Sequence, residues 1–175
     1  MTSGKLTPAW YALHTRSRFE NVVSDILTRK SVEIFLPKIE VRSKRRDRKK
    51  MIHVPLFPGY LFVRTNLDPR EHLEILKTKG AVRLVGNNSG PVSVPSESII
   101  SLNIMLAADK EVITGTRFKK GNRVIVTSGP FAGMAGTFVQ YKGADRVVVH
   151  IGVLGQFAAV EINAADIEIL SEILS

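Results

Sequence analysis

The clearest chemical signal in this sequence is a cluster of basic residues. Residues 42–50 hold seven Lys and Arg against a single Asp, a net charge of +6. Neutralising phosphates with so dense a cluster releases counterions, which favours binding to a polyanion. A solvated loop that serves only solubility is the alternative. The cations expected to contact nucleic acid here are Arg45, Arg46, Arg48 and Lys49.

Catalytic and metal-binding chemistry finds no support in the residue spacing. The four histidines are scattered, and the chain has neither a Gly-rich phosphate loop ending in Lys-Ser/Thr nor a His-Glu-x-x-His motif. The chain has no cysteine, which excludes disulfides, thiolate zinc sites and cysteine nucleophiles. We therefore expect a protein that is not an enzyme and that uses no cofactor and no metal.

The composition is that of a globular protein, with 44% hydrophobic and 23% charged positions among 175 residues. No apolar run approaches the roughly 18 residues needed to span a bilayer, and the first residues lack the apolar segment of a secretory signal. We expect a cytoplasmic monomer with no membrane partner. The charge is unevenly distributed, because residues 1–108 carry 18 Lys and Arg against 9 Asp and Glu, whereas residues 109–175 carry seven of each kind.

Alternating and helical patterns in the first part of the chain predict the elements that position the cations. Residues 10–15 predict a strand, and the Ser-Arg-Phe-Glu sequence at 17–20 predicts a capping box that starts a helix with one apolar stripe. Residues 34–41, paired with 51–54 and 57–65, predict a β-hairpin whose tip is the cation cluster. The tip must then face solvent.

Two further helices complete this part. Asp68 followed by Pro69 predicts a capped helix start, and residues 95–107 predict a third helix with apolar residues on one face. Together these elements predict an α+β domain in which helices flank a mainly antiparallel sheet.

Residues 109–171 have a different pattern. Residues 109–116 lack apolar periodicity and predict an interdomain linker. Short β-favouring runs punctuated by glycine follow over residues 117–171. They predict a small all-β five-stranded SH3-like barrel, because closure removes the exposed edges of so short a sheet.

Three segments resemble a known family. Residues 118–138, which begin Phe-Lys-Lys-Gly-Asn-Arg-Val and contain Gly-Pro-Phe-Ala-Gly, resemble a KOW motif. The Trp-Tyr-Ala-Leu run at 10–13 and the Pro-Leu-Phe-Pro-Gly-Tyr-Leu-Phe-Val run at 55–63 resemble the NusG N-terminal domain. The chain is identified as a member of the NusG family. The second run, the basic tip and residues 90–95 look more like specialised RfaH and UpxY-type antiterminator paralogues than like the housekeeping factor.

The resemblance implies a transcription elongation and antitermination factor. Residues 9–108 would form an N-terminal domain that binds the clamp helices of RNA polymerase and suppresses pausing and termination at specific operons. Residues 117–171 would form a KOW domain that binds Rho or a small-subunit ribosomal protein. The alternatives are a housekeeping NusG, acting in general elongation and Rho-dependent termination, and a ribosome-associated RNA-binding KOW protein.

The resemblance also implies a set of contact residues. Those for RNA polymerase are His14, Phe57, Tyr60, Phe62, Ile99 and Leu102. Strand alternation places Leu61 and Val63 on one face and Tyr60 and Phe62 on the other, and we expect the two aromatic residues to point outward.

The resemblance places Arg16 and Lys79 where paralogues face the non-template strand of DNA in the elongation complex. Phe131 lies at a loop tip in the KOW motif, where we expect an exposed ring that binds the partner of the KOW domain. The alternative is that Phe131 folds back as a lid on a small barrel.

Overall fold

The computed structural model describes residues 7–43, 50–117 and 120–170. The chain divides into two compact units, residues 1–95 and residues 96–175. Within the described ranges, no helix is long and apolar enough to cross a membrane.

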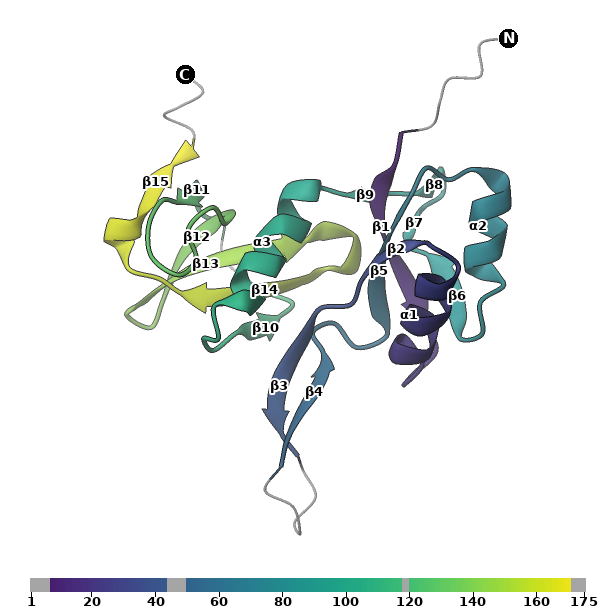
Figure 1. The fold of residues 1–175 in the computed structure, drawn as a ribbon. Helices are drawn as coiled ribbons and strands as arrows, with labels where there is room; N and C mark the ends of the chain where they lie inside the picture. The colour runs from purple at the N-terminus through teal and green to yellow at the C-terminus, as the bar shows by residue number, and fades with distance from the viewer. Residues whose placement is uncertain (1–6, 44–49, 118–119, 171–175) are drawn as a thin grey trace. The chain divides into compact units, whose positions relative to one another are not determined.

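The first unit is built on an antiparallel sheet flanked by two helices. Strands follow the order β2 (Glu33–Phe35), β5 (Tyr60–Thr65), β1 (Ala9–Thr15) and β6 (Ala81–Leu84), and β9 (Ser93–Val94) also pairs with β1. Helices α1 (Glu20–Arg29) and α2 (Pro69–Leu76) lie together beside this sheet (Figure 1). The expected α+β class is confirmed for this unit.

One face of this sheet forms the core with the helices. Side chains from both helices pack on alternate strand residues, so Leu61 and Val63 contact the α1 and α2 side of the sheet. The buried members of this core are Tyr11, Leu13, Val23, Leu27, Val32, Leu61, Val63, Ile75 and Leu84.

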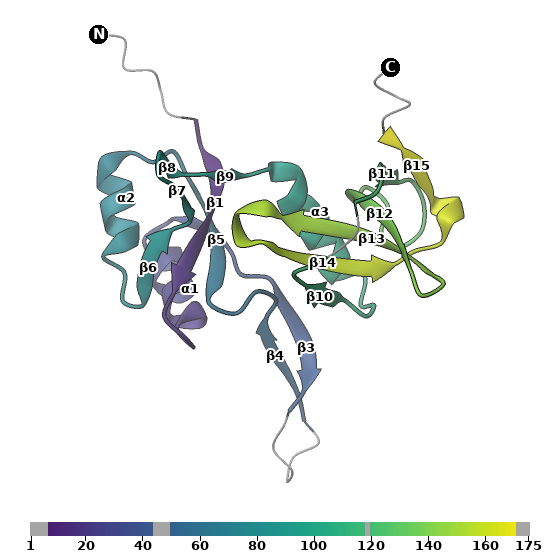
Figure 2. The same ribbon diagram turned by 180° about the vertical axis from the view of Figure 1, so that it is seen from behind.

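A two-stranded hairpin projects from the first unit in both views (Figure 1; Figure 2). It consists of β3 (Lys38–Arg42) and β4 (Met51–Pro55), and its register pairs Arg42 with Met51. The predicted hairpin is therefore confirmed, although the expected single strand over residues 34–41 is wrong. Pro37 separates β2 from β3, and its carbonyl accepts a 2.8 Å hydrogen bond from the Leu56 N–H, so the chain leaves the sheet there.

The start of α1 also differs from the prediction. The helix begins at Glu20, and its N-cap residue Phe19 makes no side-chain capping bond. Arg18 has a φ of 66°, a left-handed conformation that a helix starting at Ser17 cannot contain. The start of α2 follows the prediction, because the Asp68 side chain accepts the Arg70 N–H at 3.0 Å.

The second unit contains α3 (Ser96–Ala107) and a six-stranded antiparallel sheet. The strand order is β10 (Ile113–Gly115), β14 (Gln156–Glu161), β13 (Ala144–Ile151), β12 (Ala135–Tyr141), β11 (Arg123–Val126) and β15 (Ile167–Ile169). The five predicted strands are present as β11 to β15. The pairing runs from β10 at one edge to β15 at the other, and closure into a barrel stays a prediction.

The sixth strand corrects the expected linker. Ile113 to Gly115 pair with β14, so part of the segment 109–116 belongs to the sheet. A strand of three residues is too short to show alternation, and its position depends on a partner more than 40 residues away.

Two short connections complete the fold. The strands β7 (Gly86–Asn87) and β8 (Gly90–Pro91) form a small hairpin. The single-turn 3-10 helices η1 (Gly152–Leu154) and η2 (Ala164–Asp166) lie on either side of β14 in the sequence.

Candidate functional site

Aromatic side chains gather on the face of the first sheet that is opposite α1 and α2. His14 and Tyr60 are directly paired across β1 and β5, and their ring centroids lie 5.1 Å apart with the planes inclined by 28°. We call the set His14, Phe35, Phe57, Tyr60 and Phe62 the aromatic face. The structure thus brings together four of the six residues predicted to bind polymerase.

The other end of the aromatic face holds three phenylalanines, of which Phe57 and Phe62 are buried and Phe35 is half-buried. The Phe62 ring stacks on Phe35 at 6.0 Å between centroids and meets Phe57 edge-on at 6.2 Å. Phe62 is 0% exposed, so the expectation that it points outward into solvent is wrong. The face was predicted correctly, but alternation does not tell whether other rings cover it. Tyr60, His14 and Phe35 are half-buried, so the accessible part of this face consists of the His14–Tyr60 stack and part of Phe35.

A buried carboxylate holds the turn that carries the aromatic residues. Glu20 is only 6% exposed, and its Oε1 accepts the Gly59 N–H at 2.9 Å. The Gly59 carbonyl accepts the Thr15 N–H at 2.8 Å, and the Tyr60 N–H donates to the Phe57 carbonyl at 3.0 Å. Glycine suits this turn because its φ is +87°. Sequence analysis missed Glu20, since the helical pattern places it on the polar side.

Two predicted basic residues lie next to each other at the end of β1. The Arg16 N–H donates to the Gly80 carbonyl at 2.8 Å, which brings Arg16 beside the residue that follows Lys79. Both side chains are exposed. Arg83, also exposed, is the cross-strand partner of His14 and therefore shares its face of the sheet. Sequence analysis missed Arg83, although its alternation within the strand over 81–84 was a usable signal.

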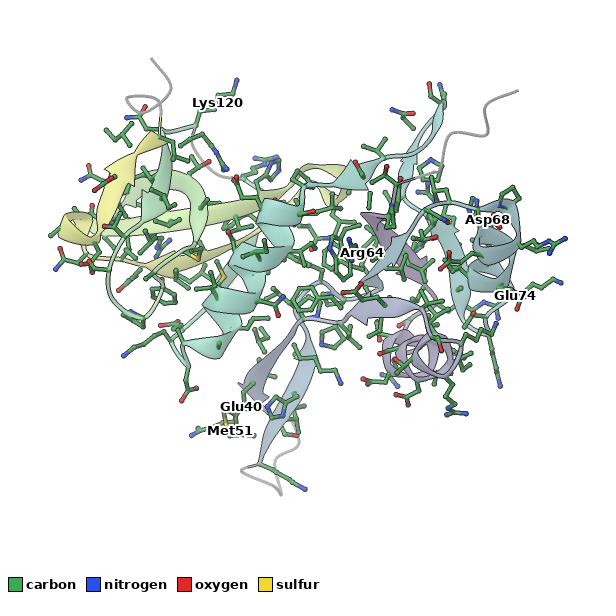
Figure 3. The ribbon with its side chains drawn as sticks, turned by 45° about the horizontal axis from the view of Figure 1, so that its top comes forward. Glu40, Met51, Arg64, Asp68, Glu74 and Lys120 are labelled. Atoms are coloured by element: carbon green, nitrogen blue, oxygen red, sulfur yellow. The ribbon has the colours of Figure 1, made fainter. Side chains whose placement is uncertain are left out.

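The basic tip itself lies outside the described residues, so Arg45, Arg46, Arg48 and Lys49 have no structural account. The described stem ends where the tip was predicted, because the Ser43 N–H donates to the Lys50 carbonyl at 2.9 Å. Glu40 and Met51 lie along this stem (Figure 3).

The two docking residues predicted on α3 belong to the second unit. Ile99 and Leu102 are both buried. The helix is attached to the sheet of that unit by the buried Ser101, whose hydroxyl makes two 3.0 Å hydrogen bonds to the backbone of Ala135. Near the start of the helix, Glu97 forms an ion pair with Arg123.

Phe131 is not exposed, which corrects the expectation of a projecting ring. Its side chain is 4% exposed, as the alternative of a folded-back lid requires. The loop is tied down by bonds from the Gly133 N–H to the Val126 carbonyl, at 2.8 Å, and from the Met134 N–H to the Phe131 carbonyl, at 3.1 Å. Burying the ring removes apolar surface from water, which is favourable.

A cavity of about 270 Å³ adjoins Phe131. Its lining combines apolar and charged side chains: Lys110, Glu111, Ile113, Pro130, Phe131, Glu161, Ile162, Asn163 and Asp166. Asp166 is already engaged, because its Oδ1 accepts the Ser128 hydroxyl at 2.6 Å.

The described part of the chain contains no group of three His, Asp or Glu side chains that could hold a metal ion. The four histidines lie on different elements. His14 is on the aromatic face, His53 on the hairpin, His72 on α2 and His150 on β13 of the second unit.

The chain is similar to proteins of one family. The family model described as "NusG: Transcription termination factor nusG" matches residues 8–103. The Thermus thermophilus "Transcription termination/antitermination protein NusG" is 28% identical, over 90% of this chain and 96% of its own length. The protein of the same name from Rickettsia felis is 23% identical, over 93% of this chain and 90% of its own length.

A solved structure has a similar fold. It is described as "Domain interaction in Thermotoga maritima NusG", is 23% identical, and aligns with a TM-score of 0.50 over 95% of this chain and 99% of its own. This likeness concerns the fold alone.

Proposed function

Since the chain belongs to the NusG family, which consists of transcription factors and not of enzymes, we propose that it binds RNA polymerase during elongation. The observation that carries this proposal is the aromatic face, where half-buried His14 and Tyr60 form a stacked pair. Aromatic side chains that keep part of their surface accessible are the usual anchors of protein interfaces.

The proposed docking domain spans residues 9–108, and its partner is the clamp helices of the polymerase. Tyr60 is the anchor on which this surface depends most, because its ring is accessible and rests on His14. Phe57, Phe62, Ile99 and Leu102 are buried, so in this proposal they support the surface or contact polymerase only where it is rearranged.

Binding of the full-length chain to a purified clamp-helix fragment tests this surface. Tyr60→Ala is expected to weaken binding by about 30-fold, since an aromatic anchor contributes about 2 kcal/mol or more. Tyr60→Phe, which keeps the ring, is the matched control and should bind nearly as the wild type does. Phe62→Ala is unsuitable, because removing a buried ring costs about 3–5 kcal/mol of stability. If folded Tyr60→Ala and the wild type bind the fragment with equal affinity, the proposal that Tyr60 anchors this surface is refuted.

Nucleic-acid contact is proposed for the exposed cations at the end of β1 and for the hairpin tip. Arg16 and Lys79 are adjacent and exposed, and Arg83 adds a third positive charge nearby. Such contacts position a protein on phosphates without reading the base sequence.

Salt dependence of binding to a DNA-containing elongation complex tests this proposal. Replacing Arg16 and Lys79 by Gln should lower the slope of log K against log salt by about 0.7–0.9 per lost phosphate contact. Replacing the exposed Arg29 of α1 by Gln is the control and should leave the slope unchanged. The quadruple Ser variant of Arg45, Arg46, Arg48 and Lys49 tests the tip in the same assay, and an unchanged slope would make the cluster a solubility device.

The second unit is proposed to include a KOW domain, residues 117–171, preceded by a segment, residues 109–116, of which Ile113 to Gly115 pair with the sheet. Its proposed partners are Rho or a small-subunit ribosomal protein, bound beside Phe131, which lines a cavity that also contains Ile113 and Ile162. Phe131→Leu keeps an apolar side chain in place but removes the ring. Loss of binding to both purified partners by the folded variant supports this role, and unchanged binding refutes it.

A general elongation role is the first form of this proposal. It is supported by relatives that carry the NusG name and align over at least 90% of both chains. Operon-specific antitermination is the second form, and the density of charge in residues 42–50 favours it. Occupancy mapped along the genome separates the two, since a general factor is found on most transcribed genes and a specialist on few.

The ribosome-associated alternative predicts strong binding to structured RNA without polymerase. The equal numbers of acidic and basic residues in 109–175 disfavour it, because free RNA binding relies on net positive charge.

A further inference from the structure

A groove on the second unit lies apart from the residues used so far. It has a volume of about 490 Å³, and strands β10, β12, β13 and β14 contribute most of its walls. Its lining is Thr114, Gly115, Arg117, Val139, Tyr141, Arg146, Val148, Phe157 and Ala159. None of these residues lines the cavity beside Phe131.

The floor of the groove is apolar. Val139, Val148 and Ala159 form a buried cluster of their own, and Phe157 packs against it. The strand register explains the cluster, because Val148 is directly paired with Ala159 and all these side chains share one face of the sheet. At one end of the floor, Tyr141 is 46% exposed. The floor therefore offers contact area to an apolar side chain of a ligand.

The charged residues that line the groove are both cationic. Arg117 is exposed, and Arg146 is half-buried with its guanidinium carbon 5.2 Å from the centroid of the Tyr141 ring. Lys142 brings a further positive charge to that ring, at 5.3 Å. No Asp or Glu lines the groove, and the one acidic residue directly across from a lining cation is Glu161, the cross-strand partner of Arg146. Arg117, Lys142 and Arg146 outnumber it, so the local charge favours an anion.

Arg146 has an unsatisfied donor at this place. Its Nε is buried and has no hydrogen-bond partner among the described residues. A buried N–H without an acceptor is unfavourable, and a carboxylate can accept from a guanidinium through two parallel bonds. The groove therefore suits a ligand that carries an anionic hydrogen-bond acceptor next to an apolar group.

We propose that this groove binds an acidic and apolar segment of a partner protein. The apolar side chain of the segment packs on Val139, Val148 and Ala159, and a neighbouring carboxylate pairs with Arg146 and Arg117. A single-stranded nucleic acid fits less well. The floor is mainly aliphatic, cations already contact the Tyr141 ring, and residues 109–175 carry no excess of positive charge.

The test uses the isotopically labelled full-length chain and a blocked synthetic peptide in which leucines alternate with glutamates. We expect saturable shifts of the amide signals of Val139, Val148 and Ala159. Replacing Arg117 and Arg146 together by Gln should weaken this binding by at least about tenfold, since a single bond to a charged group is worth about that factor. Arg29→Gln, which removes one Arg charge from α1 by the same type of substitution, is the control and should leave the affinity unchanged.

Three results would overturn the proposal. The first is equal affinity for a peptide with glutamine in place of glutamate, which would make the groove purely apolar in preference. The second is tighter binding of a uridine oligonucleotide to the same residues, and the third is no shift at millimolar peptide. Should the double variant unfold, Arg117→Gln alone is measured, because this side chain is exposed and its replacement should not disturb the fold. An unaltered peptide affinity of Arg117→Gln would then also refute the site.

Discussion

Replacing Ser101 by Ala should loosen the attachment of α3 to the sheet of the second unit. The Ser101 hydroxyl donates to the Ala135 carbonyl and accepts the Ala135 N–H, both at 3.0 Å, and the residue is 1% exposed. The pairing of β12 with β13 begins at Thr137 and Val148, so Ala135 lies beyond it. The serine hydroxyl thus takes the place of a strand partner for two buried backbone groups.

The expected loss of stability follows from the Ala135 N–H and the Ala135 carbonyl. A buried donor or acceptor left without a partner costs about 1–3 kcal/mol, so losing both bonds should cost the second unit about 2–6 kcal/mol. With a urea dependence of about 2 kcal/mol per molar, the denaturation midpoint should fall by about 1–3 M. The amide signals of residues 120–170 in the full-length chain report this midpoint separately from the first unit.

Ser98→Ala supplies the matched control, since it makes the same chemical change on the same helix outside this pair of bonds. It should shift the free energy of unfolding by no more than about 0.5 kcal/mol. The reasoning would be refuted by a Ser101→Ala midpoint that equals that of Ser98→Ala. The hydroxyl would then have no larger effect than a half-buried serine elsewhere on the helix.

Three further substitutions test the first unit. Glu20→Ala removes the acceptor of the Gly59 N–H and should cost about 1–3 kcal/mol in urea denaturation followed by the single tryptophan, whereas Glu20→Gln keeps an oxygen and should cost clearly less; equal losses would show that the bond is unimportant. Gly80→Ala should lower the melting temperature more than Gly143→Ala, because both residues have positive φ but only at Gly80 would a Cβ lie 2.5 Å from an aromatic ring; a smaller effect at Gly80 contradicts this. Asp68→Ala removes the N-cap of α2 and should cost about 1 kcal/mol, with Asp68→Ser largely restoring it; no loss on thermal unfolding would mean that the cap is dispensable.

Local patterns were sufficient for most of the secondary structure. The five strands of residues 123–169 follow from short β-favouring runs between glycines, and the α2 start follows from an Asp-Pro cap. Alternation along β5 also assigned Tyr60 to one face and Leu61 to the other. Each of these features depends on residues that are neighbours in the sequence, so periodicity and capping chemistry reveal them.

The sequence by itself thus determined the family, the elements and the face on which each strand residue lies. Only the tertiary structure decided which side chains are covered: Phe62 is buried where it contacts two other rings, and Phe131 is buried although it lies in a loop. It also determined which residues far apart in the sequence are hydrogen-bonded, such as Glu20 with Gly59 and Ser101 with Ala135. Burial and long-range hydrogen bonds depend on which segments meet in space, and no repeat of apolar residues along one segment encodes that meeting.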